Sequence, residues 1–310
     1  MLPGGSGHSK RLCPGFPLPD RSQYRMKSPK ALQPLIDDGI VDAVLRQLKS
    51  GKEASVFLVS CGGAVRCAKV YKEAEHRGFH KLAEYQEGRR ARGSRDARAM
   101  GKGSRHGRRE QEAAWKNAEV EALYRLAAAG VRVPQPHGYY EGVLLMEVVR
   151  GADGEVAPRL NDVAPEPDVA RAWHAFLVRQ IVRMLCAGLI HGDLSEFNVL
   201  LAEDGPVIID LPQAVDASGN NNAFRMLRRD VDNVTAYCGR FAPELLDTEY
   251  AFEIWKLYQD AELKPDSPLT GRYVHDDTAA DVEGVLHQIA EARAEAEARQ
   301  RGREAAEADD

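Results

Sequence analysis

The sequence predicts an α+β fold of two lobes, a small β-rich N-lobe and a helical C-lobe. The chain has 310 residues, which is enough for two lobes around one cleft. Its strand patterns lie before residue 150, and most of its helical patterns follow that position. Hydrophobic residues make up 44% of the chain, which is sufficient for a sizeable core.

The predicted N-lobe covers residues 28–149. Apolar residues at helical spacing over 31–49 predict two short helices, which Gly39 divides. Four further elements are expected in this lobe: strands over 54–59 and 64–71 that meet at a Cys-Gly-Gly hairpin turn, a helix over 113–129, and a strand over 143–149.

The predicted C-lobe covers residues 150–278. Its three helical patterns span 170–188, 222–240 and 243–261, and Gly188 is expected just past the end of the first. Two segments flank the lobes: a disordered lead over 1–27 and an Ala/Glu/Arg-rich helical tail over 279–310.

Residues 76–110 form a basic insertion in the N-lobe, which we expect to be mobile. They hold eleven basic and four acidic residues, a balance of +7, although the whole chain has a net charge of −5. This charge can attract RNA phosphates, and Ser94 and Ser104 offer hydroxyls for autophosphorylation. An insertion without a function is the alternative interpretation.

The most informative segment runs from residue 189 to residue 200. An apolar pair leads into His-Gly-Asp, and Asn198 follows Asp193 by five residues. This is the layout of a kinase catalytic loop, in which the aspartate orients an attacking hydroxyl and the asparagine holds a metal on nucleotide phosphates. A second apolar run ends in Asp210, whose carboxylate can take the second metal position. These residues predict a magnesium–nucleotide site.

Other polar residues near this loop are expected to have structural roles. We expect His191 to fix the loop by hydrogen bonds rather than to act in acid–base catalysis. Asp216, Asp230 and Asp232 are expected to be surface or capping residues.

The turn over residues 50–56 is expected to cover the phosphates. Its backbone N–H groups and the hydroxyls of Ser50 and Ser55 can bind phosphate, and Lys52 and Val56 belong to the same turn. The turn matches neither G-x-G-x-x-G nor the P-loop pattern, so an ordinary turn is the alternative. Its position before a strand favours the functional interpretation.

Lys69 lies inside an apolar strand, where an ammonium group is costly unless it is paired. The functional interpretation pairs it with a carboxylate and with nucleotide phosphates, and an edge-strand lysine that reaches water is the alternative. Glu119 and Glu121 both begin the next helix on different faces. Glu119 is in register with the apolar residues of that helix, so we expect it to be the partner.

The segment Met146–Val149 is expected to receive the adenine, because it leads from the last strand of the N-lobe into the second lobe. Adenine needs a backbone donor and a backbone acceptor on an extended connector, and Met146, Glu147 and Val149 are the candidates. The end of an ordinary core strand is the alternative interpretation.

Composition also restricts the cofactor and the cell compartment. Asn198 and Asp210 supply hard oxygen ligands, so the expected metal is Mg²⁺ or Mn²⁺ with ATP, whereas the five cysteines are scattered without zinc-binding spacing and predict no structural zinc. Their odd number favours reduced thiols and a cytoplasmic location. No apolar run approaches the roughly 20 residues of a membrane span, so no membrane partner is expected.

In order and spacing, eight segments resemble the RIO family of atypical protein kinases, and more closely its type-one branch. They lie within residues 32–245 and comprise 50–56, 68–72, 133–136, 144–147, 151–160, 191–198, 208–213 and 224–230. The resemblance implies an ATP- and Mg²⁺-dependent serine kinase of two-lobed, protein-kinase-like fold, which can also act as an ATPase switch. Phe197 stands where Tyr is common, and Leu211-Pro212 where Val-Ser is common.

The resemblance also implies a role for each matching site residue. Lys69 and Glu119 form an ion pair, and Asp193 is the catalytic aspartate. Asn198 and Asp210 hold the metal, and in the ATPase mode Asp210 can itself accept phosphate. Ser55 contacts phosphate, and the backbone near Glu147 and Val149 binds adenine.

Three functions remain open from the sequence alone. The first is a protein kinase or ATPase that phosphorylates a protein hydroxyl, its own included, with a role in ribosome assembly. The second is a small-molecule kinase of the aminoglycoside or choline type, which also uses His-Gly-Asp-Leu and a later Asn. The third is a nucleotide-regulated module that binds ribosomal RNA or the ribosomal subunit through residues 76–110.

Overall fold

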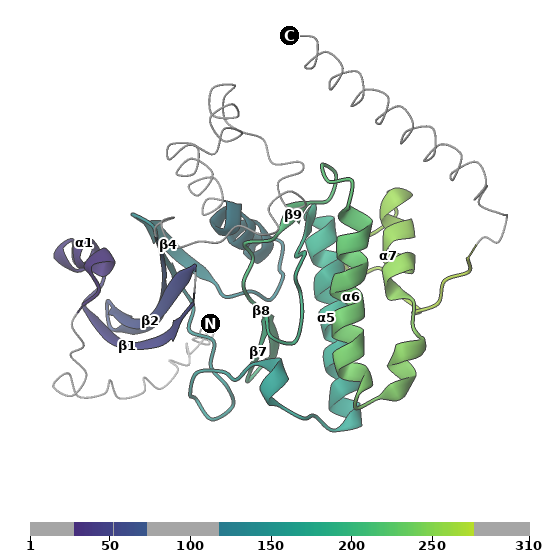
Figure 1. The fold of residues 1–310 in the computed structure, drawn as a ribbon, viewed down its shortest axis with the longest axis horizontal. Coiled ribbons are helices and arrows are strands. Elements are labelled where there is room, and N and C mark those ends of the chain that lie inside the picture. Colours follow the sequence, from purple (N-terminus) through teal and green to yellow (C-terminus); the bar gives the residue numbers. More distant parts are fainter. Residues whose placement is uncertain (1–27, 52, 73–117, 276–310) are drawn as a thin grey trace, which may run out of the picture. The chain divides into compact units, whose positions relative to one another are not determined.

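The computed structural model describes residues 28–51, 53–72 and 118–275 (Figure 1). The predicted lead over 1–27, the insertion over 76–110 and the tail over 279–310 lie outside these residues. The chain divides into two compact units, Met1–Gly271 and Arg272–Asp310, and every element below belongs to the first. In the described residues, no helix is long and apolar enough to cross a membrane.

The N-lobe is built on a five-stranded antiparallel sheet with the strand order β1-β2-β3-β5-β4 (Figure 1). Its strands are β1 (Ala43–Ser50), β2 (Ala54–Cys61), β3 (Ala64–Tyr71), β4 (Pro136–Tyr140) and β5 (Val143–Met146). The predicted hairpin is present, and Gly62 and Gly63 have φ values of 57° and 81°. Two residues at positive φ are typical of the tight turns that match strand twist, and glycine adopts this conformation at little cost.

The two faces of the sheet have different surroundings. On one face, η1 (Lys30–Leu32) and α1 (Gln33–Asp37) contribute Leu32 and Leu35 to a core with apolar residues of every strand but β4. On the other face, Tyr71 and Leu144 join a larger core with the helix over residues 118–128 and with the C-lobe. Because side chains alternate along a strand, Lys69 shares the second face with Tyr71.

The prediction of a second helix within residues 31–49 is wrong, because that segment forms strand β1. β1 has two irregularities in its pairing with β2, between Val44 and Arg46 and between Gln47 and Lys49. A bulge inserts an extra residue and interrupts the two-residue alternation of a strand. Two bulges in eight residues leave apolar positions at a spacing that resembles a helix. The predicted break at Gly39 is present, with a φ of 71°.

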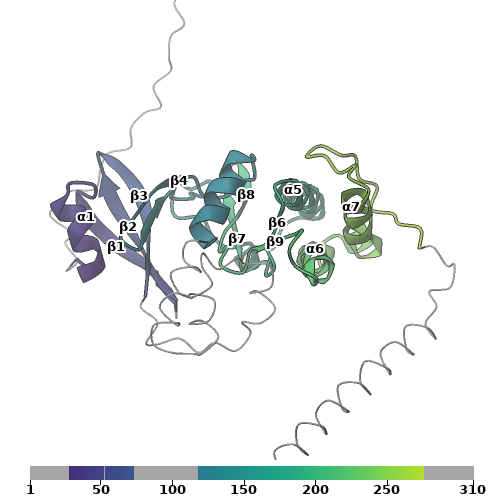
Figure 2. The same ribbon diagram turned by 90° about the horizontal axis from the view of Figure 1, so that it is seen from above.

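The C-lobe is mainly helical, with one small β-hairpin and one short two-stranded ladder whose strands are distant in sequence. Its elements are η3 (Leu160–Asp162), α5 (Pro167–Cys186), β6 (Leu189–Ile190), β7 (Val199–Ala202), β8 (Gly205–Ile208), β9 (Val215–Asp216), α6 (Ala223–Gly239), η4 (Pro243–Asp247) and α7 (Tyr250–Gln259). α5, α6 and α7 lie side by side, and β7 and β8 lie between them and the five-stranded sheet (Figure 1, Figure 2). The α+β, two-lobed, kinase-like fold is therefore confirmed.

Two predicted elements differ in extent. The helix predicted over 243–261 is divided into η4 and α7, because Thr248 has extended backbone angles. The strand predicted over 143–149 ends at Met146, and the following residues form a connector without strand pairing. Gly188 has a φ of 75° directly after the Ala187 C-cap of α5, as the sequence predicts.

Candidate active site

A cleft of about 600 Å³ is lined by residues of both the five-stranded sheet and the C-lobe. This volume is in the range of small-molecule and cofactor pockets. Its apolar lining includes Leu48, Val56, Leu144, Met146, Val149 and Leu200. Its charged lining includes Lys49, Lys69, Glu119, Arg159 and Asp210. The cleft can therefore hold a ligand that has a flat apolar part and a charged part.

Lys69 lies at the centre of the charged lining. Its Nζ donates to Glu119 Oε1, and it lies 3.2 Å from Oδ1 of Asp210. The Lys69 side chain is 14% exposed. Burial alone would lower the pKa of Lys69, but the two carboxylates outweigh this effect and raise the pKa above its ordinary value. The ammonium group is therefore permanently charged and directed into the cleft.

Glu119 comes from the helix over residues 118–128 and is only 4% exposed. Its face of the helix is apolar, since Leu123 and Leu126 are also buried. Glu121 is exposed on another face, so the structure brings Lys69 together with the carboxylate chosen from the sequence. Tyr71 lies close by, and burial together with the Glu119 carboxylate raises the pKa of its hydroxyl.

Asp210 follows the β7–β8 hairpin and has a positive φ of 69°. This conformation is uncommon outside glycine, and such outliers occur preferentially at functional sites. Burial would raise the pKa of Asp210, but Lys69, with smaller contributions from His191 and Lys49, holds it below its usual value. The carboxylate is therefore ionised at neutral pH.

Asn198 lies at the same end of the hairpin as Asp210. Ile209 N donates to the Asn198 carbonyl over 2.9 Å, which continues the strand register by one residue. Asn198 Nδ2 donates to the Asp193 carbonyl over 2.9 Å, which leaves its Oδ1 as the possible ligand atom. A carboxylate and an amide oxygen are the hard donors that Mg²⁺ or Mn²⁺ prefers, and nucleotide phosphates can complete the shell. The donor set fits such a cation.

Asp193 is exposed at the tip of its loop, and His191 is buried beneath it. Asp193 N lies 3.3 Å from His191 Nδ1 and donates to it, so Nε2 carries the ring proton. That Nε2 lies 3.1 Å from the Ile209 carbonyl, to which it donates. His191 thus ties the loop of Asp193 to the segment of Asp210, which is the structural role expected for it.

Asp230 has a different position from the one expected, because it is 1% exposed rather than at the surface. Its Oδ2 accepts a hydrogen bond from Gly192 N, and its Oδ1 accepts one from Leu194 N, both over 2.8 Å. Asn233, from the same helix α6, donates to the Leu194 carbonyl over 2.8 Å. Two polar side chains of α6 therefore fix the backbone on both sides of Asp193.

The turn over residues 50–56, which is expected to cover the phosphates, is described except for Lys52. Val56 lines the cleft, whereas Ser50 Oγ and Ser55 Oγ face each other over 3.3 Å at the base of the turn. Lys72 Nζ donates to Ser50 Oγ over 3.1 Å and to the Gly51 carbonyl over 2.6 Å. The turn is thus held closed by side chains from both strands.

The connector after β5 offers the backbone groups that adenine needs. Met146 lines the cleft beside it. Glu147 N donates to the Gln135 carbonyl over 2.8 Å, and the Val149 carbonyl accepts from Ala157 N over 3.0 Å. Within the described ranges, the Glu147 carbonyl and the Val149 N–H make no hydrogen bond. One acceptor and one donor therefore remain at the edge of the cleft.

Unlike the backbone carbonyl of Glu147, its side chain is already bound, by Arg132. The two guanidinium Nη atoms each lie 3.0 Å from one Glu147 carboxylate oxygen. Arg132 also reaches Asp204 in the β7–β8 turn, at 3.2 and 3.3 Å. Its backbone N donates to Gln180 of α5 over 2.8 Å. The sequence patterns gave no sign of this clamp, because its members are far apart in the chain.

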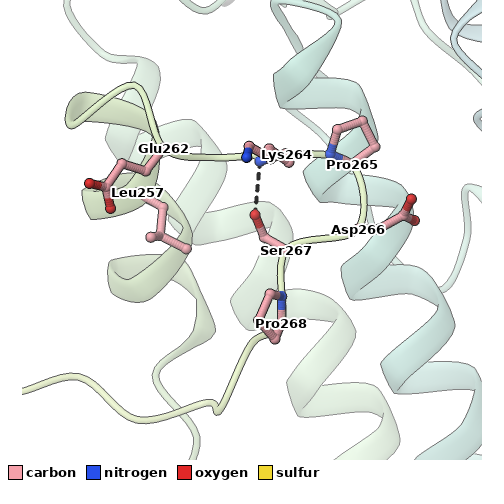
Figure 3. A pocket seen from close by; sticks show the side chains of 7 residues that line it. All are labelled: Leu257, Glu262, Lys264, Pro265, Asp266, Ser267 and Pro268. Carbon is pink, nitrogen blue, oxygen red and sulfur yellow. Dashed lines mark hydrogen bonds between the residues drawn. The ribbon is translucent and has the colours of Figure 1, made fainter.

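A second hollow, beyond the end of α7, has no comparable chemistry (Figure 3). Lys264 N donates to Ser267 Oγ over 2.8 Å, so this hydroxyl closes a turn. The carboxylates of Glu262 and Asp266 point away from each other (Figure 3). Most of the residues expected to bind a metal–nucleotide complex line the first cleft instead, namely Val56, Lys69, Glu119, Met146, Glu147, Val149 and Asp210.

A β-sheet lobe with a Lys–Glu pair, facing a His-Gly-Asp loop and a β-hairpin that ends in Asp210, defines a protein-kinase-like phosphotransferase. The RIO domain model matches residues 55–251. The chain is 37% identical over 213 residues to the RIO-type serine/threonine-protein kinase Rio1 of Haloferax volcanii, with 68% of each protein covered. It belongs to the RIO family of atypical serine/threonine protein kinases.

Two further relatives have the same relationship at lower identity. Rio1 of Methanocaldococcus jannaschii is 31% identical over 220 residues, which are 70% of this chain and 69% of that protein. The human serine/threonine-protein kinase RIO1 is 30% identical over 225 residues, which are 71% of this chain but only 37% of the human protein. The chain thus matches little more than a third of the human relative.

Proposed function

We propose that this chain transfers the γ-phosphate of ATP to a serine or threonine hydroxyl of a protein, its own included, and can also hydrolyse ATP. The observation that carries the proposal is the contact of Lys69 with both Glu119 and Asp210 at the cleft. In protein kinases the corresponding pair must be in place for phosphoryl transfer. Membership of the RIO family supports a protein substrate over a small molecule.

Each site residue has a role in this proposal. Asp193 orients the attacking hydroxyl, and Lys69 binds phosphate oxygens. Asn198 and Asp210 hold Mg²⁺ or Mn²⁺, which when bound neutralises charge on the phosphates. Glu147 and Val149 bind adenine through their backbone, and the turn of Ser50, Lys52, Ser55 and Val56 covers the phosphates.

Substitution of Asp193 by alanine tests the proposal. We expect phosphoryl transfer to fall by about 10²- to 10⁴-fold, because a positioned acid–base group is lost. Nucleotide affinity should stay close to that of the wild type, because Asp193 lies outside the cleft lining. Radiolabelled ATP measures transfer to the chain itself and to added proteins, and a fluorescent nucleotide measures binding. Autophosphorylation at the wild-type rate would contradict the role of Asp193.

The wider setting of this activity is inferred from composition. Four cysteines in the described residues are free thiols, which fits a reducing compartment such as the cytoplasm. The divisions at residues 27, 149 and 278 remain the proposed domain limits. Contact with ribosomal RNA or the ribosomal subunit depends on the charge of residues 76–110 alone. RNA affinity measured against salt, with and without this segment, tests that part.

A further inference from the structure

Lys69 is accompanied in the cleft lining by two other cations, Lys49 and Arg159. Lys49 comes from the end of β1, and Arg159 comes from the residue before η3, so the two sides of the cleft each contribute one. Lys69 has two carboxylate partners. In the part of the chain that the structure describes, neither the Lys49 ammonium nor the Arg159 guanidinium has an ion pair or a side-chain hydrogen bond.

The strand register places Lys49 on the face of the sheet that lines the cleft. Lys49 pairs with Val56 of β2, and Val56 pairs with Lys69 of β3. Directly paired residues of neighbouring strands have their side chains on the same face. Lys49, Val56 and Lys69 therefore form one row across the sheet, and all three line the cleft. Two strand spacings separate the lysine backbones by about 10 Å.

The charges around Lys49 are close enough to affect one another. Burial lowers the pKa of Lys49, and the positive charges of Arg159 and Lys69 lower it further, while Asp210 acts in the opposite direction. Like charges that face one another destabilise the cleft, and an anion between them would remove the repulsion.

The charge inventory of the cleft indicates which anion. Lys69 is already neutralised by Glu119 and Asp210, and the lining also holds the carboxylates of Glu53, Glu147 and Asp162, so carboxylates outnumber cations in the cleft. The polyphosphate of ATP carries about four negative charges, and one divalent cation compensates only about half of them. A phosphate chain entering this cleft therefore needs further positive charge, which Lys49 and Arg159 are placed to supply.

We propose that Lys49 and Arg159 bind the polyphosphate of ATP from opposite sides of the cleft and select nucleotides by their phosphate charge. This rests on the proposed ATP-dependent activity and adds two ligand residues to it. A single lysine–phosphate contact in a partly desolvated cleft contributes about as much as a hydrogen bond to a charged group. Loss of either residue should therefore weaken ATP binding about tenfold.

The test measures the binding affinities of adenosine, ADP and ATP with Mg²⁺ present. Each ligand is titrated into the wild type, Lys49→Gln, Arg159→Gln and the double variant. We expect each single variant to bind ATP about tenfold more weakly and to bind adenosine with unchanged affinity. Lys49→Arg should restore most of the ATP affinity because it keeps the charge. Arg46→Gln is the matched control, because Arg46 is an exposed cation of the same strand outside the cleft lining. Thermal unfolding shows that each variant is folded.

The outcomes are separable. Wild-type ATP affinity in both variants would overturn the proposal while leaving the kinase function intact. An equal loss of adenosine and ATP affinity would also overturn it, because the effect would then be on cleft shape. If the wild-type chain bound no ATP at all, the proposed function itself would be wrong, and this proposal with it.

Discussion

Asp230 connects helix α6 to the loop that carries Asp193. It lies on the apolar face of α6 with Met226, Leu227 and Val234, all of which are buried. The position of a carboxylate within an apolar stripe is visible in the sequence and was a signal that the residue is buried. Its partners were not predictable, because they are backbone N–H groups that lie 36 and 38 residues away.

Replacement of Asp230 by asparagine should destabilise the protein by about 1–3 kcal/mol, because an amide N–H₂ would face a buried backbone N–H. Phosphoryl transfer should fall at the same time, since the loop on both sides of Asp193 loses an anchor. Urea unfolding and a kinase assay measure the two effects. Asp232→Asn is the matched control, because Asp232 is exposed on the same helix. Equal effects of the two substitutions would contradict the anchoring role.

The same residue should make the free energy of unfolding depend on pH. Burial raises the pKa of Asp230 to about 6, whereas an aspartate in the unfolded chain titrates near 3.9. Between these values the folded protein holds one more proton than the unfolded chain, so stability from this group falls as the pH rises. The advantage of wild type over Asp230→Asn should therefore be largest below about pH 4 and reach its lower limit above about pH 6. An advantage that grows over this interval would contradict the assignment.

At the scale of elements, the sequence predicted those that have regular periodicity. The β2–β3 hairpin, α5 and α6 follow simple patterns with glycine turns at their ends, and each is present. β1 was not predictable, because its two bulges remove the alternation on which strand recognition depends. The ion pair of Lys69 and Glu119 was predictable, because a lysine within an apolar strand requires a partner.

The connector after β5 depends on the clamp of Arg132, Glu147 and Asp204. We expect Arg132→Ala to raise the KM for ATP by about 3- to 10-fold with kcat within about twofold, because the clamp holds the backbone that we propose to bind adenine rather than the reacting atoms. Arg171→Ala is the matched control, since Arg171 also lies between two carboxylates but on α5. Steady-state kinetics with varied ATP distinguishes the two. A loss confined to kcat would exclude a positioning role at the connector.

At the scale of the whole molecule, the five-stranded sheet lies between two hydrophobic cores, and only the second of them includes residues that line the cleft. The first core lies between α1 and one face of the sheet. The second includes the opposite face, which lines the cleft, and the C-lobe. β5 contributes to both, because Val143 and Leu145 belong to the first and Leu144 to the second. A nucleotide in the cleft would therefore contact structure that depends on both cores.

A bound nucleotide should stabilise the two lobes together. At a hundred times its Kd, Mg²⁺–ADP should add about 2.7 kcal/mol to the free energy of unfolding. Amide hydrogen exchange should slow both in β3 and in the β7–β8 hairpin, since Lys69 and Asp210 lie at these elements. Protection limited to one of the two would mean that the nucleotide binds one lobe only.

The left-handed backbone at Asp210 also limits which inactive forms of the chain are useful as reagents. Glycine and asparagine tolerate a φ of 69°, whereas alanine in this conformation costs about 1 kcal/mol or more. Asp210→Ala would therefore confuse loss of chemistry with a weakened fold. For a catalytically inactive variant that still competes for the binding partners of the protein in a cell, asparagine at this position is the better choice.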